Sequence, residues 1–98
     1  MGELKMQGGW TQDLMIERFW SAANKGLEGE VIKNHSIDPK LLAIRLVAVH
    51  AAAEQLGVEL PPVYLLRKAV RRCPRFLRIR WVRGPKGTRA VSCWIFKR

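Results

Sequence analysis

The feature that most limits how this chain can fold is a pair of adjacent prolines, Pro61 and Pro62. Proline lacks an amide hydrogen and fits only the first turn of a helix, so such a pair either follows one helix or begins another. The apolar residues after the pair recur at helical spacing. They are Val63, Leu66, Val70 and Cys73. This spacing predicts that the prolines begin an amphipathic helix over residues 62–73, which Pro74 ends.

The polar face of this predicted helix is almost entirely cationic. It carries Tyr64, Arg67, Lys68, Arg71 and Arg72. A helix with one apolar and one basic face packs the apolar face on a core and leaves the basic face free for a partner. We therefore expect these five side chains to bind nucleic acid.

Basic residues are concentrated in the same part of the chain. Residues 1–60 contain six lysines and arginines and all eight acidic residues, whereas residues 61–98 contain twelve basic residues and no acidic one. Charge of one sign at this density repels itself unless a polyanion neutralises it, and it attracts nucleic acid. The charge distribution therefore favours a nucleic acid partner for the segment after residue 60.

Two elements are predicted near the start of the chain. Thr11 can cap a helix over residues 12–25, in which Phe19 lies on the apolar face, and Gly26 is expected to end that helix. A short strand is expected over residues 30–33.

One long central helix is predicted next. Asp38 followed by Pro39 is typical of a helix start, and the helix is expected to run to Leu56 and to be closed by Gly57. Its apolar side chains cover nearly the whole circumference, which indicates burial on more than one side. The helix is therefore either the centre of the domain or half of a homodimer interface, and the sequence does not separate these alternatives.

The C-terminal segment predicts a basic β-hairpin. Apolar and basic residues alternate from residue 77 to residue 81, glycines and a proline follow over residues 84–87, and apolar residues return over residues 91–96. The candidate nucleic-acid-binding residues of the hairpin are Arg78, Arg80, Arg83, Lys86 and Arg89. Trp81 and Trp94 are expected to be core residues of the hairpin rather than platforms for base stacking.

The order of these elements resembles the winged-helix variant of the helix-turn-helix superfamily over residues 12–96. Its local motif places the small residue Ala53 in the first helix of the pair and Gly57 in the turn. The apolar residues of that motif are Leu56, Val58, Val63 and Leu66. The resemblance implies an α+β fold of three helices with a C-terminal basic hairpin wing. Residues 11–98 would form this single domain, after a flexible segment of residues 1–10.

The resemblance also implies how nucleic acid would be bound. The helix over residues 62–73 would lie in the major groove, and the hairpin tip from Arg83 to Arg89 would lie along the backbone or the minor groove. Arg67, Lys68 and Arg71 are the candidates for contacts to base edges. A weaker similarity links the C-terminal end to winged-helix modules of phage and plasmid replication helicases, so both replication and transcription are expected contexts.

We carry three hypotheses for the function. The first is binding of double-stranded DNA by a small winged-helix regulator of transcription or replication. The second is binding of RNA or single strands in a ribonucleoprotein, for which exposed tryptophans would argue. The third is a protein-interaction adaptor or inhibitor encoded by a mobile element, which would dock on an acidic partner.

Other classes of protein are not expected. No motif indicates an enzyme, a cofactor or a metal site. Cys73 and Cys93 are expected to be buried thiols, because no CxxC motif or secretory context accompanies them. The sequence also lacks a secretory signal and a membrane span, so a cytoplasmic, nucleoid-associated or nuclear protein is expected.

Overall fold

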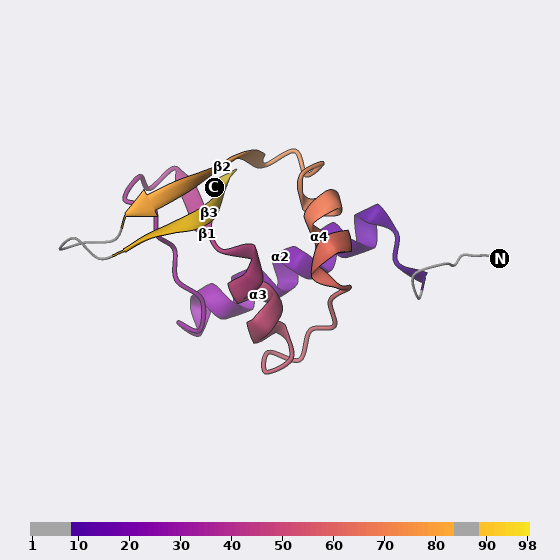
Figure 1. Cartoon of the computed structure of the whole chain (residues 1–98). Coiled ribbons are helices and arrows are strands. Elements are labelled where there is room, and N and C mark those ends of the chain that lie inside the picture. Colours follow the sequence, from indigo (N-terminus) through magenta and orange to yellow (C-terminus); the bar gives the residue numbers. More distant parts are fainter. Residues whose placement is uncertain (1–8, 84–88) are drawn as a thin grey trace.

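The computed structural model describes residues 9–83 and 89–98, which form an α+β arrangement (Figure 1). Within these residues the chain has three helices and one three-stranded antiparallel sheet. The elements in chain order are α2 (Gln12–Glu28), β1 (Leu41–Ile44), α3 (Leu46–Ala53), α4 (Val63–Val70), β2 (Phe76–Arg83) and β3 (Ala90–Lys97). The predicted fold class, three helices with a C-terminal hairpin, is confirmed at this level.

The strand order of the sheet is β1-β3-β2. The central strand β3 pairs with both neighbours, so Trp94 lies opposite Ile44 of β1 and opposite Ile79 of β2. Strands β2 and β3 form the predicted hairpin, and both extend beyond the alternating residues that indicated them. The two edges of the sheet are therefore β1 and β2.

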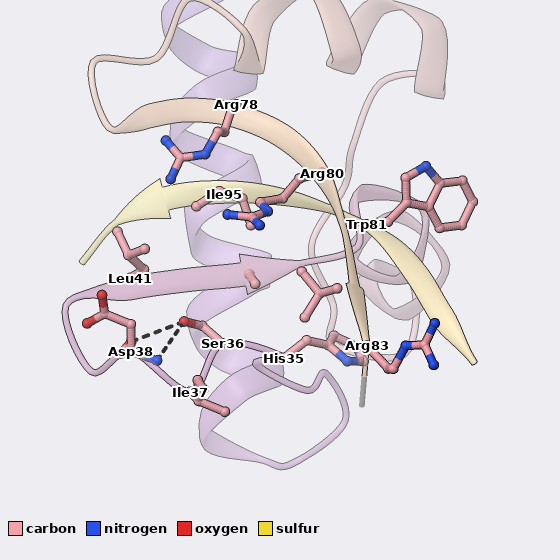
Figure 2. A pocket seen from close by; sticks show the side chains of 12 residues that line it. His35, Ser36, Ile37, Asp38, Leu41, Arg78, Arg80, Trp81, Arg83 and Ile95 are labelled. Atoms are coloured by element: carbon pink, nitrogen blue, oxygen red, sulfur yellow. Dashed lines mark hydrogen bonds between the residues drawn. The ribbon is translucent and has the colours of Figure 1, made fainter. Parts of the chain in front are cut away.

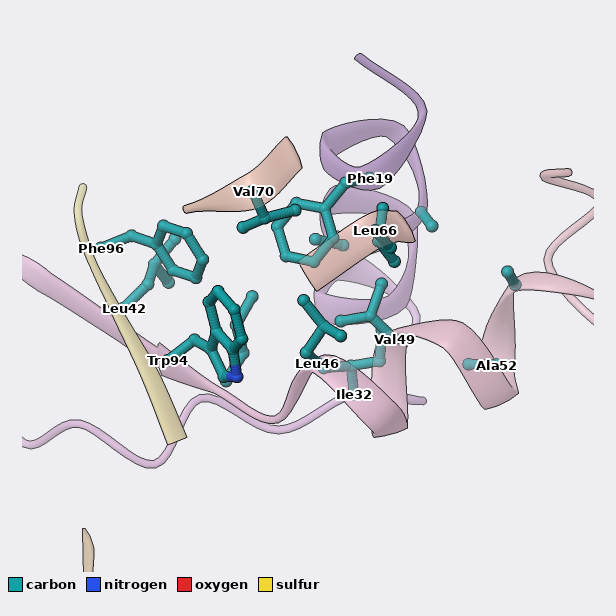
Figure 3. Packing of buried hydrophobic residues seen from close by; sticks show 14 of the residues in the cluster. Phe19, Ile32, Leu42, Leu46, Val49, Ala52, Leu66, Val70, Trp94 and Phe96 are labelled. Carbon is teal, nitrogen blue, oxygen red and sulfur yellow. The ribbon is translucent and has the colours of Figure 1, made fainter. Parts of the chain in front are cut away.

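The helices cover one face of this sheet. Phe19 of α2 packs on Phe96 of β3 with ring centroids 5.7 Å apart, and Leu66 and Val70 of α4 join the same cluster (Figure 3). All four side chains are fully buried. Burial of this shared apolar cluster is the main force that holds α4 against α2 and the sheet.

Helix α2 begins as predicted and ends later. The hydroxyl of Thr11 accepts a hydrogen bond from the backbone N–H of Leu14 at 3.1 Å, which confirms the cap. The predicted end at Gly26 is wrong, because α2 continues to Glu28. Gly26 lies inside the helix, where an added Cβ would collide with the side chain of Ile32. The glycine is therefore explained by close packing rather than by helix termination.

The strand predicted over residues 30–33 is also wrong. The backbone N–H groups of Val31 and Ile32 both donate to the carbonyl of Gly26, at 2.8 and 3.0 Å. The chain thus turns back on the end of α2 and buries the Ile32 side chain in the core. Two adjacent β-branched residues resemble a strand, but here they belong to a turn.

The long central helix predicted from residue 38 is wrong in its first part. The carboxylate of Asp38 accepts a hydrogen bond from the N–H of Lys40 at 2.9 Å and so organises a turn, after which Leu41–Ile44 form β1. These residues are a strand because they pair with residues 94–97 of β3. The local sequence pattern does not reveal a pairing strand about fifty positions away. Of the predicted central helix, only residues Leu46–Ala53 are helical.

The apolar side chains that suggested a homodimer interface are buried within a single chain. Leu42 and Ile44 lie on the helix-bearing face of the sheet and belong to the main core, whereas Ala43 lies on the opposite face in a second cluster. All three are buried. The apolar residues that encircled a single predicted helix are thus divided among two faces of a sheet and the shorter helix α3, and they no longer argue for a dimer.

The turn after α3 has the geometry of a glycine-terminated helix end. Gly57 adopts the left-handed region with φ 74°, and its N–H donates to the carbonyl of Glu54 at 3.2 Å. The N–H of Val58 donates to the carbonyl of Ala53 at 2.9 Å. This pair of hydrogen bonds is the Schellman motif, which requires a residue that tolerates positive φ.

The prolines begin α4, as predicted. Pro62 is the N-cap residue, and the carbonyl oxygen of buried Pro61 lies 2.9 Å from Nε2 of His50 in α3. That contact ties the start of α4 to the preceding helix. Helix α4 ends at Val70, a few residues earlier than predicted, and residues 71–75 form turns that lead into β2.

Replacing Gly57 by alanine is expected to lower the free energy of unfolding by about 1–2 kcal/mol. No atom lies within 4 Å of an added Cβ, so the cost comes only from the positive φ. Asparagine tolerates this conformation better, and Gly57→Asn is expected to cost less than Gly57→Ala. Urea denaturation measures both values, and equal losses for the two variants would contradict this explanation.

Candidate nucleic-acid interface

Helix α4 and the turn that follows it present a basic surface to solvent. Its side chains are Tyr64, Arg67 and Lys68 of the helix, the C-cap residue Arg71, and Arg72 of the turn, and all five are exposed. The opposite face of the helix, formed by Leu66, Ala69 and Val70, is buried. Because the apolar side is locked into the core, the orientation of the basic face is fixed. We call this set of five exposed residues the basic face of α4.

One member of that face connects it to the sheet. The guanidinium of Arg71 lies over the ring of Trp94 in β3, 5.8 Å from the ring centroid. Trp94 is only 6% exposed and packs against Phe76, so it is a core residue, as predicted. The end of α4 therefore meets the helix-bearing face of the hairpin at Trp94.

The alternation of β2 divides the predicted basic residues between two faces of the sheet. Ile79 and Trp81 lie opposite Trp94 and Ser92, which places them on the helix-bearing face. By the same alternation Arg83 lies on that face. We call Ile79, Trp81 and Arg83 the inner row. The row leads away from the end of α4 and is exposed along its length.

Arg78 and Arg80 lie on the opposite face and form what we call the outer pair. Their β3 partners are Ile95 and Cys93, which pack in the second apolar cluster, on the face away from the helices. Figure 2 shows the outer pair on one side of β2, and the indole of Trp81 and the guanidinium of Arg83 extending to the other side. The structure therefore does not bring all the predicted hairpin arginines to one surface.

The outer pair borders a groove of about 500 Å³, which residues 81–83 of β2 also line. The opposite wall is the loop that contains His35, Ser36 and Asp38, and apolar residues of β1 and β3 lie between the two walls (Figure 2). The loop is fixed to β1, because the N–H of His35 donates to the carbonyl of Ala43 at 2.8 Å. In return, the N–H of Ala43 donates to Oδ1 of Asn34 at 2.9 Å.

Partial burial lowers the pKa of His35 below its ordinary value, and the positive charges of Lys33 and Arg45 lower it further. Burial raises the pKa of Cys93, on the same side of the sheet, and Arg45 opposes that rise. Lys33 and Arg45, which lie outside the C-terminal segment, therefore act electrostatically on groups of this face.

The shift at His35 predicts a specific dependence of stability on pH. The unfolded chain takes up a proton near the ordinary pKa of 6.5, whereas the folded chain does so only at lower pH. Stability should therefore fall as the pH drops from above 6.5 toward the lowered pKa. His35→Asn should remove the part of this fall in stability that His35 causes. The measurement is the free energy of unfolding of both proteins above and below pH 6.5. The same decline in both proteins would contradict the assignment.

Arg75 is a basic residue whose role the sequence did not reveal. Its guanidinium lies 3.9 Å from the centroid of the Trp20 ring, and its Nε–H donates to the carbonyl of Lys97 at 3.0 Å. The indole N–H of Trp20 in turn donates to the sulfur of Cys73 at 3.4 Å. Arg75 thus holds the turn after α4 against α2. Its position directly after Pro74, between helix and strand, is the only sequence signal that sets it apart from its basic neighbours.

The remaining predicted residues are placed as follows. Arg89 is exposed just before β3, and Lys86 lies outside the described residues. Cys73 and Cys93 are buried and free, as expected. In residues 9–83 and 89–98, no group of three or more His, Cys, Asp or Glu side chains could hold a metal ion. No helix in the same ranges is both long and apolar enough to cross a membrane.

Comparison with known proteins identifies no relative: no family model, curated protein or solved structure matches the chain. The functional interpretation therefore depends on the geometry and charge described above.

Proposed function

We propose that this protein binds double-stranded DNA as a winged-helix domain, with α4 in the major groove and the hairpin along the adjacent backbone. The observation that carries the proposal is the basic face of α4. It is exposed, contains four cations and no acidic residue, and is held rigidly by a fully buried apolar face. Such a face is complementary to the phosphates and base edges of a duplex.

The dimensions of α4 agree with this role. An α-helix with its side chains is about 10–12 Å across, and the major groove is about 12 Å wide. The turn that precedes α4 leaves its first residues accessible, since Tyr64 is 58% exposed. The order of helices and strands along the chain agrees with the order that suggested a winged helix, with β1 in place of the strand predicted over residues 30–33.

Arg83 extends the proposed interface along the hairpin. It lies at the far end of the inner row, which begins beside Arg71 at the end of α4. Arg67, Lys68 and Arg71 would reach base edges or phosphates in the groove, and Arg83 would contact the backbone. The outer pair lies on the other side of the sheet and is not part of this interface.

Fluorescence anisotropy with a labelled duplex, the matching single strand and a hairpin RNA tests the proposal. We expect the duplex to bind tightest in the presence of random-sequence competitor. Tighter binding of the RNA or the single strand would support the ribonucleoprotein hypothesis instead. Absence of binding to all three at physiological salt would support the hypothesis of a protein partner.

A further inference from the structure

Trp81 is the most exposed large apolar side chain of the hairpin. It is 70% exposed, whereas Trp94 on the neighbouring strand is 6% exposed and lies in the core. The sequence predicted the same role for both, and the expectation of a buried Trp81 is wrong. Trp81 lies beyond the region of the sheet that the helices cover, so nothing in the described residues buries its ring. An indole held in solvent on a regular strand is a feature that a binding partner would explain.

The surroundings of Trp81 indicate what kind of partner it would meet. It follows Ile79, which is 38% exposed, and precedes Arg83 on the same face of β2. Two residues of strand span about 7 Å, so the ring lies about that far along β2 beyond Ile79 and the Arg71–Trp94 contact. The inner row thus presents an aromatic ring between cations, at the edge of the surface proposed to bind duplex DNA.

An aromatic ring between cations fits an unpaired base better than a duplex. In a duplex the faces of the bases are stacked on one another and cannot be reached, and phosphates need cations rather than an indole. An unpaired base offers its π-face, and stacking of such a base on an aromatic side chain contributes about 1–3 kcal/mol. Arg83 would then neutralise the phosphate of the same strand.

Self-association through β2 is the competing explanation, because β2 is an edge strand with a free side. A second copy paired along that edge would bring Arg78, Arg80 and Arg83 close to the same residues of its partner. Like charges at a strand edge oppose such pairing. The charge of β2 therefore favours a polyanion over a second copy of the chain.

We propose that Trp81 stacks on an unpaired base next to the duplex held by α4, so that the preferred ligand is a junction between duplex and single-stranded DNA. This inference rests on the proposed function. It adds to that function a selectivity for DNA ends, gaps or forks.

The test compares three labelled ligands in fluorescence anisotropy: a blunt duplex, the same duplex with a thymine tail, and the free thymine strand. The wild-type protein is expected to bind the tailed duplex at least about 5-fold more tightly than the blunt one, from the lower limit of the stacking energy. Trp81→Ala should reduce the ratio of the two affinities to about 1 and leave affinity for the blunt duplex nearly unchanged. Trp81→Phe, which keeps an aromatic ring, should retain part of it.

Other outcomes overturn the inference in distinguishable ways. Equal affinity of the wild type for tailed and blunt duplexes would refute it while leaving the proposed function intact. Equal weakening of both ligands by Trp81→Ala would mean that the indole contacts the duplex itself. If the wild type sediments as a dimer and the Trp81→Ala variant as a monomer, the ring serves self-association instead. Failure to bind the blunt duplex at all, or equally tight binding of the free strand, would refute the proposed function as well.

Discussion

Replacing Arg67 and Lys68 together by glutamate is expected to weaken duplex binding by at least about 100-fold. Both side chains are exposed on the basic face of α4, and each would lose a contact worth about 1–3 kcal/mol while adding repulsion against the phosphates. The affinity is measured by anisotropy at fixed salt. Circular dichroism and a thermal melt show whether α4 stays folded, since glutamate in the last turn of a helix is mildly unfavourable.

The matched control is Arg78→Glu with Arg80→Glu. It changes the net charge by the same amount but alters the opposite face of the sheet, where the outer pair borders the groove. We expect this control to lower affinity by less than about 10-fold, through long-range electrostatics alone. Equal losses in the two double variants would mean that net charge, rather than the face of α4, determines binding.

Replacing Phe19 by alanine is expected to cost about 3–5 kcal/mol of stability. Its ring is fully buried at the junction of α2 with β3 and lies 5.2 Å from Trp20 and 5.7 Å from Phe96, between ring centroids. Domains of this size have about 5–15 kcal/mol of stability in total, so the variant should be close to unfolding at moderate temperature. Urea denaturation gives the free energy of unfolding.

Val47→Ala is the control for this substitution. Val47 belongs to α3 but is 45% exposed, and its truncation should cost less than about 1 kcal/mol. A loss below about 1.5 kcal/mol for Phe19→Ala would contradict the placement of that ring at the centre of the core.

The elements that the sequence predicted well are those whose signals are local. The basic and apolar faces of α4 follow from residues within two turns of each other, and the prolines fix where that helix begins. The cap at Thr11 and the turn at Gly57 likewise depend on neighbouring residues alone. Each of these features was read from side-chain chemistry that acts over only a few positions.

The features that the sequence did not predict depend on distant partners. Strand β1 has the composition of a helix and becomes a strand only because β3 lies beside it. Alternation in β2 predicted which side chains share a face, but not how far the helices cover that face. Trp81 was therefore expected in the core and is exposed, whereas Trp94 is buried. The separation of the outer pair from the inner row, by contrast, follows from that alternation.

The salt dependence of duplex affinity tests the central claim most directly. If about six phosphates are neutralised, the logarithm of the association constant should fall against the logarithm of salt concentration with a slope of about −5. Replacing Arg67 and Lys68 by glutamine should reduce the magnitude of that slope by about 2, because two phosphate contacts are lost. The same substitution at Arg78 and Arg80 should leave it unchanged. A flat salt dependence of the wild type, or equal slopes in all three proteins, would contradict the account.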